Sequence, residues 1–176
     1  MAAAKAAVAA LKLDKLLLIP AAIPPHKALP EGTPEGAHRL AMTERMADAL
    51  SMPKVAEVSR MELDREGKSY TADTLRAIRA QYPDAQLWLL MGTDMFLTLH
   101  LWHDPEVITQ LAGICAFGRT EQDGEELFAP QREFLSQKYQ AQIVTITLPG
   151  LVDVSSTRLR ELLARGEGQE YLLPQV

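Results

Sequence analysis

Short apolar runs alternate with amphipathic stretches along the whole chain. Lys15–Pro20 contains a continuous apolar run, which is typical of a strand buried on both faces of a parallel sheet. A proline-rich loop follows, and His38–Leu50 then places its apolar residues at helical spacing. The same reasoning along the chain predicts helices near 1–13, 38–50, 71–82, 94–101, 130–140 and 156–165, and strands near 15–20, 55–63, 86–91, 113–117 and 142–148.

This order of elements predicts an α/β fold, with a doubly wound, mostly parallel sheet and helices on both faces. The 176 residues show no internal repeat and are enough for a single domain spanning 1–176. In such sheets, ligands bind beyond the carboxyl ends of the strands. Residues that carry chemistry should therefore lie in the segments directly after strands.

Composition narrows the classes of partner. The chain has 18 Lys and Arg against 23 Asp and Glu, a net charge of −5, which disfavours binding to nucleic acid. It has no run of about 18 apolar residues that could cross a bilayer, and its alanine-rich start lacks an export cleavage site. The single cysteine, Cys115, cannot form an internal disulfide, so we expect an inert core thiol and a cytoplasmic protein.

The first candidate binding residues are His26 and Lys27. Pro24 and Pro25 stiffen the backbone before them, so the imidazole and the ammonium group have little conformational freedom left to lose. This arrangement suits a monophosphate. By itself, the segment is equally well explained as a rigid surface loop with a solvated lysine.

A second candidate is the predicted helix start at Tyr70 and Thr71. Free backbone N–H groups at a helix N-terminus favour a carboxylate or a phosphate. Taken alone, the segment is better explained by ordinary capping, with the Thr71 hydroxyl on the first N–H groups and Asp73 complementing the helix dipole.

Two further candidates follow the strand 86–91. Gly92 allows a ligand close to the backbone, and Asp94 can accept hydrogen bonds from ribose hydroxyls, unless it is simply an N-cap. Trp102 could stack on a flat heterocycle, although most tryptophans only pack in the core. His100 and His103 have helical spacing, but without a nearby trio of Asp, Glu or Cys residues they make a poor metal pair.

Hydroxyl and guanidinium groups are concentrated at the start of the last predicted helix. Hydroxyls in the first turn, with arginines just behind them, place O–H donors, N–H donors and positive charge at the positive end of the helix dipole. We expect Leu159, Leu162 and Leu163 to face the core, so that the polar residues face outwards. The set suits a polyphosphate, and the alternative is an over-capped amphipathic helix. Its members are Ser155, Ser156, Thr157, Arg158 and Arg160.

Taken in this order, the segments resemble the bacterial nicotinate mononucleotide adenylyltransferases, which belong to the nucleotidyltransferase superfamily and have a Rossmann-like fold. The resemblance covers nearly the whole chain, and its strength lies in the ordered set. The motifs are Pro-Pro-His-Lys (24–27), Ser-Tyr-Thr-Ala-Asp-Thr-Leu (69–75), Gly-Thr-Asp with Trp-His (92–103), Val-Ser-Ser-Thr-Arg-Leu-Arg (154–160) and Tyr-Leu-Leu-Pro-Gln-Val (171–176).

The resemblance implies transfer of AMP from ATP to nicotinate mononucleotide, giving nicotinate adenine dinucleotide and pyrophosphate in NAD synthesis. It implies Mg²⁺ on the phosphates and a direct in-line attack without a covalent enzyme intermediate. On the mononucleotide side, His26 and Lys27 would bind the phosphate. The backbone near Tyr70 and Thr71 would meet the pyridine carboxylate, and Trp102 would stack on the pyridine ring.

The resemblance also implies an ATP site. Gly92 and Asp94 would line the adenosine part of it. The phosphates would lie against the start of the last helix, at Ser155, Ser156, Thr157 and Arg160.

The chain departs from the family pattern at its start. The family begins with a strand and a loop ending in His-x-Gly-His, and none of the four histidines here stands in such a motif, so no catalytic residue is assigned. In a doubly wound sheet of order 3-2-1-4-5 the first strand is central, and its absence would expose two strand edges. We therefore expect an N-terminally truncated chain that is inactive on its own.

Three alternatives stay open. The chain could be a related adenylyltransferase for nicotinamide mononucleotide or pantetheine phosphate, although Tyr70, Thr71 and Trp102 favour the nicotinate substrate. Without His-x-Gly-His it could instead be a non-catalytic nucleotide-binding domain. It could also be an unrelated α/β domain with accidental matches. The oligomeric state is not predicted.

Overall fold

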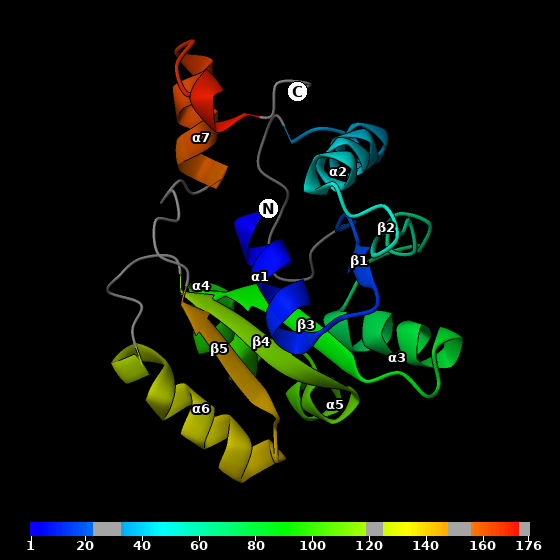
Figure 1. Cartoon of the computed structure of the whole chain (residues 1–176), viewed down its shortest axis with the longest axis vertical. Helices are drawn as coiled ribbons and strands as arrows, with labels where there is room; N and C mark the ends of the chain where they lie inside the picture. Colours follow the sequence, from blue (N-terminus) through cyan, green and yellow to red (C-terminus); the bar gives the residue numbers. More distant parts are fainter. Residues whose placement is uncertain (23–32, 119–124, 148–155, 173–176) are drawn as a thin grey trace.

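The computed structural model describes residues 1–22, 33–118, 125–147 and 156–172 (Figure 1). Helices and strands alternate along the chain, as the apolar periodicity predicts. The helices are α1 (Ala2–Leu11), α2 (Gly36–Leu50), α3 (Thr71–Gln81), α4 (Thr93–Thr98), α5 (Pro105–Leu111), α6 (Glu125–Tyr139) and α7 (Ser156–Ala164), with single 3₁₀ turns η1 (Leu99–Leu101) and η2 (Gln169–Tyr171). The strands are β1 (Leu16–Leu18), β2 (Ala56–Val58), β3 (Leu87–Gly92), β4 (Ala112–Gly118) and β5 (Ile143–Thr147).

The larger sheet is parallel and has the strand order β3-β4-β5. Its central strand, β4, is buried along all seven residues. Gly92 at the end of β3 pairs with Phe117, and Gly118 at the end of β4 pairs with Thr147. The carboxyl ends of the three strands therefore lie along one edge.

Helices cover both faces of this sheet, which confirms the predicted fold class. Side chains of β4 alternate between the faces, and Ile114 and Ala116 belong to the core that α4, α5 and α6 complete. Cys115 and Phe117 point the other way and pack with Ala7 of α1 (Figure 1). This two-sided burial explains why the strand reads as an uninterrupted apolar run.

A second, smaller parallel sheet pairs β1 with β2. Its strands are only three residues long, and Leu16 and Leu50 are buried beside it. Among the residues that the structure describes, β1 pairs only with β2 and β3 only with β4. The described strands thus form two separate sheets, with the break between β1 and β3.

Several local expectations were wrong. Tyr70, not Thr71, is the N-cap of α3, and its side chain makes no capping hydrogen bond. The strand expected over 55–63 is confined to Ala56–Val58. Helix α6 begins at Glu125 rather than near Pro130, so this proline lies inside the helix.

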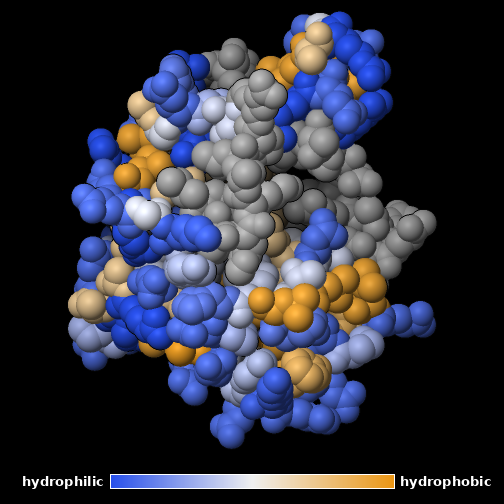
Figure 2. Space-filling view, turned by 180° about the vertical axis from the view of Figure 1, so that it is seen from behind, coloured by the Kyte–Doolittle hydropathy of each residue, from blue (hydrophilic) through white to orange (hydrophobic). Residues whose placement is uncertain are grey.

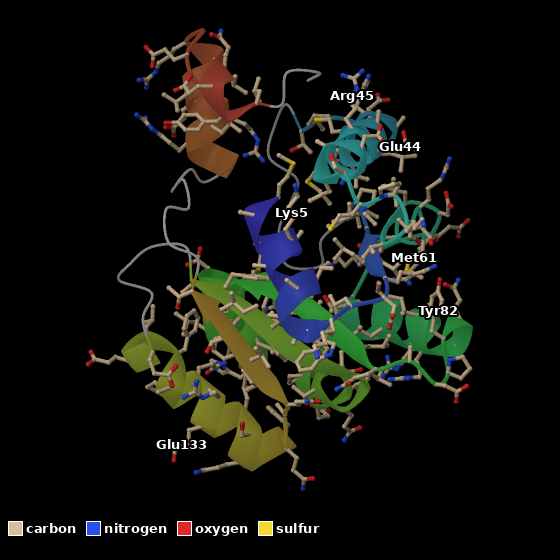
Figure 3. All side chains as sticks on the ribbon, viewed as in Figure 1. Lys5, Glu44, Arg45, Met61, Tyr82 and Glu133 are labelled. Carbon is tan, nitrogen blue, oxygen red and sulfur yellow. The ribbon has the colours of Figure 1, made fainter. Side chains whose placement is uncertain are left out.

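The polar surface follows the helix periodicity. On α6, Phe128 and Leu135 are buried, whereas Glu133 points away from the sheet (Figure 3). The face seen from behind is mainly hydrophilic with small hydrophobic areas (Figure 2). Within the described ranges, no helix is long and apolar enough to span a membrane.

The leucines of α7 do not join the sheet core, contrary to expectation. In Figure 1, α7 is set apart from the β3-β4-β5 sheet. Leu163 is exposed, and Leu159 and Leu162 lie against Gly168, where an added Cβ would come within 2.9 Å of the Leu162 Cβ.

We expect Gly113→Ala to lower the free energy of unfolding by about 1–3 kcal/mol, the usual cost of overpacking. A Cβ at Gly113 would lie 2.6 Å from a ring carbon of Trp88 on the adjacent strand. Denaturant unfolding of Gly113→Ala, of Trp88→Leu and of the double variant measures the coupling free energy between the two positions. An equal loss with and without the indole would contradict the steric explanation.

Burial raises the pKa of the Cys115 thiol from 9.0 to about 11. The unfolded chain therefore ionises this thiol first, so its contribution to stability is complete below about pH 9 and is lost as the pH rises towards 11. We expect the free energy of unfolding of the wild type to fall more steeply over this range than that of Cys115→Ala. Parallel pH profiles for the two proteins would contradict this expectation.

Candidate active site

The first part of the site is the carboxyl end of β3, where Gly92 leads directly into α4. The buried Thr93 hydroxyl donates a hydrogen bond to the Phe117 carbonyl at 3.1 Å, which joins the ends of β3 and β4. Asp94 stands in the first turn of α4 and is exposed. The structure thus places Gly92 and Asp94 at the sheet edge where ligands of doubly wound folds bind.

The second part is the N-terminus of α3. The Tyr70 carbonyl accepts hydrogen bonds from the N–H groups of Asp73 and Thr74, both at 3.1 Å. The N–H groups of Thr71 and Ala72 come before the first of these bonds and belong to the uncapped first turn. Ser69, directly before this turn, is 7% exposed, and its hydroxyl has no hydrogen-bond partner among the described residues.

The third part is the turn that contains Trp102. The backbone N–H of Trp102 donates a hydrogen bond to the Leu99 carbonyl at 3.1 Å, and the half-buried Trp102 side chain packs against the main core. Ala72 and Met91 belong to the same core. Apolar packing therefore connects the start of α3, the end of β3 and the Trp102 turn.

A ring contact joins the second and third parts directly. The centroids of the Tyr70 and His103 rings lie 4.3 Å apart, with the ring planes tilted by 39°. Tyr70 and Thr71 are thereby brought next to the turn that carries Trp102. These are the residues predicted to meet the pyridine carboxylate and the pyridine ring.

Three of the remaining predicted residues, His26, Lys27 and Ser155, lie outside the described residues. Ser156 and Thr157 begin α7, as predicted, and Arg160 is an exposed residue of the same helix. Their proposed role at the ATP phosphates stays a prediction.

Sequence reasoning missed an ionic cluster beside the Trp102 turn. Arg76 of α3 contacts Asp73 at 2.7 Å and Asp104 at 3.2 Å, and these hydrogen bonds, that to Asp104 first, raise the pKa of Arg76. Asp104 is the N-cap of α5 and has left-handed backbone geometry, with φ 51°. The Asp104-Pro105 pair was the available signal, because proline favours the first helical position after such a residue.

The two histidines weighed as a metal pair have different partners. Nδ1 of His100 lies 3.0 Å from the side-chain amide of Gln131, whereas His103 lies against Tyr70 and 3.6 Å from Asp104. In the described part of the chain, no group of three or more His, Cys, Asp or Glu residues could hold a metal ion.

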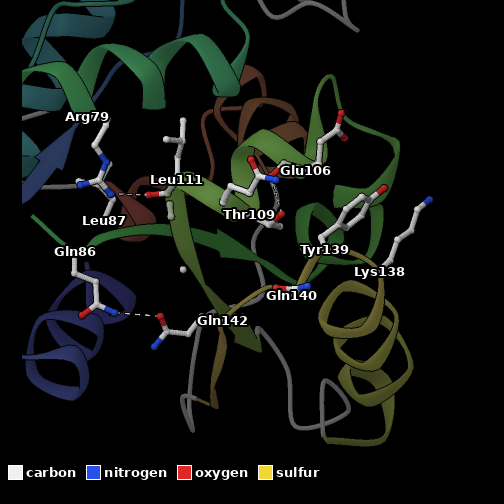
Figure 4. Close-up of a pocket in the computed structure, with 13 residues that line it drawn as sticks. Arg79, Gln86, Leu87, Glu106, Thr109, Leu111, Lys138, Tyr139, Gln140 and Gln142 are labelled. Carbon is white, nitrogen blue, oxygen red and sulfur yellow. Dashed lines mark hydrogen bonds between the residues drawn. The ribbon is translucent and has the colours of Figure 1, made fainter. Parts of the chain in front are cut away.

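A pocket of about 550 Å³ lies at the opposite edge of the sheet (Figure 4). Its walls include Leu87 and Ala112, the first residues of β3 and β4. There the Arg79 guanidinium donates hydrogen bonds to the carbonyl oxygens of Pro83 and Leu111, at 3.0 and 3.1 Å. This pocket is at the amino ends of the strands, away from the site described above.

Known proteins are similar to this chain over most of its length. The profile of the cytidylyltransferase-like family matches residues 1–162. A probable nicotinate-nucleotide adenylyltransferase of Lachnoclostridium phytofermentans is 35% identical over 98% of this chain and 83% of its own length. Another, from Acidithiobacillus ferrooxidans, is 37% identical over 94% of this chain and 78% of its own. The chain belongs to the nicotinate-nucleotide adenylyltransferase family.

Solved structures of the same enzyme class share the fold. Plasmodium falciparum nicotinic acid mononucleotide adenylyltransferase complexed with NaAD has a TM-score of 0.73 at 15% identity, and the match covers 99% of this chain and 85% of that one. The same enzyme complexed with APC has a TM-score of 0.67 at 16% identity, covering 92% and 77% of the two chains. Family membership thus rests on the sequence relatives, and these structures support the fold.

Proposed function

We propose that this protein transfers AMP from ATP to nicotinate mononucleotide, forming nicotinate adenine dinucleotide and pyrophosphate in NAD biosynthesis. The observation that carries the proposal is the Tyr70–His103 contact, which places the start of α3 beside the Trp102 turn in a member of this family. A helix N-terminus is complementary to the negative charge of the pyridine carboxylate, and an indole is complementary to the flat pyridine ring.

The pyridine carboxylate is bound by the backbone N–H groups of Thr71 and Ala72. Their helix has no side-chain cap, so these donors remain for a ligand, and the helix dipole favours a negative charge there. A neutral amide gains less from the dipole than a carboxylate does. The nicotinate substrate is therefore preferred over its nicotinamide counterpart.

The phosphate of the mononucleotide is bound by His26 and Lys27. On the other side, Gly92 and Asp94 line the adenosine site. The ATP phosphates are bound at the start of α7, through Ser155, Ser156, Thr157 and Arg160. Nucleotidyltransferases use a divalent metal with ATP, and here Mg²⁺ enters as part of the substrate.

The mononucleotide phosphate attacks the α-phosphorus of ATP directly, and pyrophosphate leaves. No protein nucleophile is needed for this exchange. The chain's contribution is to hold two anionic substrates in line and to neutralise charge as it develops. We assign the reaction to the cytoplasm.

The divided sheet supports a further part of the proposal. The edges of β1 and β3 that face away from their partners would be completed by one more parallel strand, and such a strand would also deliver the family's His-x-Gly-His motif to the carboxyl edge.

Isothermal titration calorimetry separates binding from turnover. We expect the chain to bind nicotinate mononucleotide more tightly than nicotinamide mononucleotide, and to bind Mg²⁺-ATP independently. Equal affinities for the acid and the amide would contradict the proposed carboxylate site. In a chain that also carries a His-x-Gly-His motif, ATP binding without dinucleotide formation would identify a non-catalytic nucleotide-binding domain instead.

The variant Trp102→Ala should weaken binding of nicotinate mononucleotide by roughly 1–3 kcal/mol, the range for losing one aromatic stack on a base. Affinity for Mg²⁺-ATP should stay unchanged, since the indole is assigned to the pyridine ring. Trp88→Phe is the matched control, because Trp88 packs on the far side of β3 with α1. An unchanged mononucleotide affinity in Trp102→Ala would return this residue to a packing role.

A further inference from the structure

Two side-chain contacts fasten the Trp102 turn to α3. The first is the tilted contact of the Tyr70 and His103 rings, at 4.3 Å between centroids. The second is the ion pair between Arg76 and Asp104, at 3.2 Å. Tyr70 is the N-cap of α3 and His103 follows Trp102 directly, so the ring contact spans the two groups assigned to the pyridine substrate.

The backbone of this turn is not in a relaxed state. Asp104 has φ 51° and ψ 55°, a left-handed conformation that costs free energy in a residue with a Cβ. Such a conformation persists only where surrounding contacts impose it. The Arg76 ion pair and the neighbouring ring contact join this turn to α3, beside the apolar packing of Trp102 against the core.

The two contacts differ in what they can determine. Arg76 and Asp104 are about half and one third exposed, so their ion pair contributes little free energy and tolerates several geometries. The ring contact is a short-range packing interaction with a preferred distance and tilt. It is therefore the better determinant of the spacing between Trp102 and the N-terminus of α3.

We propose that His103 is a positioning residue for substrate specificity: its ring, in tilted contact with that of Tyr70, sets the distance between the carboxylate-binding N–H groups of α3 and the indole of Trp102. This inference rests on the proposed function. A carboxylate attached to a flat ring can use both groups only when their spacing fits, whereas ATP uses neither. Loss of the ring contact should then affect the acid mononucleotide selectively.

The test compares His103→Ala with His103→Phe by calorimetry, using nicotinate mononucleotide, nicotinamide mononucleotide and Mg²⁺-ATP. In His103→Ala, the Kd for the acid should rise roughly two- to tenfold, the equivalent of one aromatic pair, and the preference for acid over amide should shrink. Because phenylalanine keeps a ring in place, His103→Phe should restore most of the acid affinity. The Kd for Mg²⁺-ATP should change by less than about twofold in both variants.

His38→Ala is the matched control, because His38 is an exposed histidine of α2 outside the site. An unchanged acid affinity in His103→Ala would overturn the proposal, as would a loss that His103→Phe does not restore. An equal loss for acid, amide and ATP would show a merely structural role. Failure of the wild-type chain to bind the acid mononucleotide would refute the proposed function itself, a result that is distinguishable from all of these.

Discussion

The parallel register of β3, β4 and β5 is the constraint on which the rest of the site depends. A slip of β4 by one residue would turn Ile114 and Ala116 towards α1, and Cys115 and Phe117 towards α4, α5 and α6. Because β4 is buried on both faces, its two sets of side chains cannot exchange faces without losing their packing. The correct register places the end of β3 where Thr93 reaches the Phe117 carbonyl, and so fixes the start of α4.

The polar groups of the site are positioned mainly by apolar neighbours. Ala72, Met91 and Trp102 pack into one core. Ala72 and Trp102 themselves carry groups assigned to the mononucleotide, and Met91 directly precedes Gly92. Burial of apolar surface supplies the stabilising free energy. The half-exposed polar contacts around Arg76 add little to this free energy.

Periodicity was sufficient to predict the alternating order of elements and most of their approximate bounds. The apolar run at 113–117 indicated a strand buried on both faces, and β4 has this environment. Short elements were harder, because three residues such as Ala56–Val58 carry no recognisable period. Helix α5 was missed, although Asp104-Pro105 marks its start.

Site prediction from the sequence had a different limit. Motifs placed Tyr70, Trp102 and Gly92 correctly at the ends of elements, because turn and capping residues act locally. The contact between Tyr70 and His103 joins separate elements, and no local pattern encodes it. Whether Thr71 or Tyr70 became the cap likewise depended on which residue took the extended backbone, here Tyr70 with φ −93° and ψ 141°.

The division of the strands into two sheets also bears on how the fold resists local opening. The β1-β2 ladder is three residues long, whereas every residue of β4 pairs with β3 or β5 and residues 114–117 pair with both. We therefore expect the amide groups of β1 and β2 to be released to solvent at a lower free energy than those of β4, and the two parts to exchange hydrogen with water as separate units. The carboxyl edge of β3 and β4 belongs to the slower unit, which keeps the start of α4 in place while the smaller sheet opens.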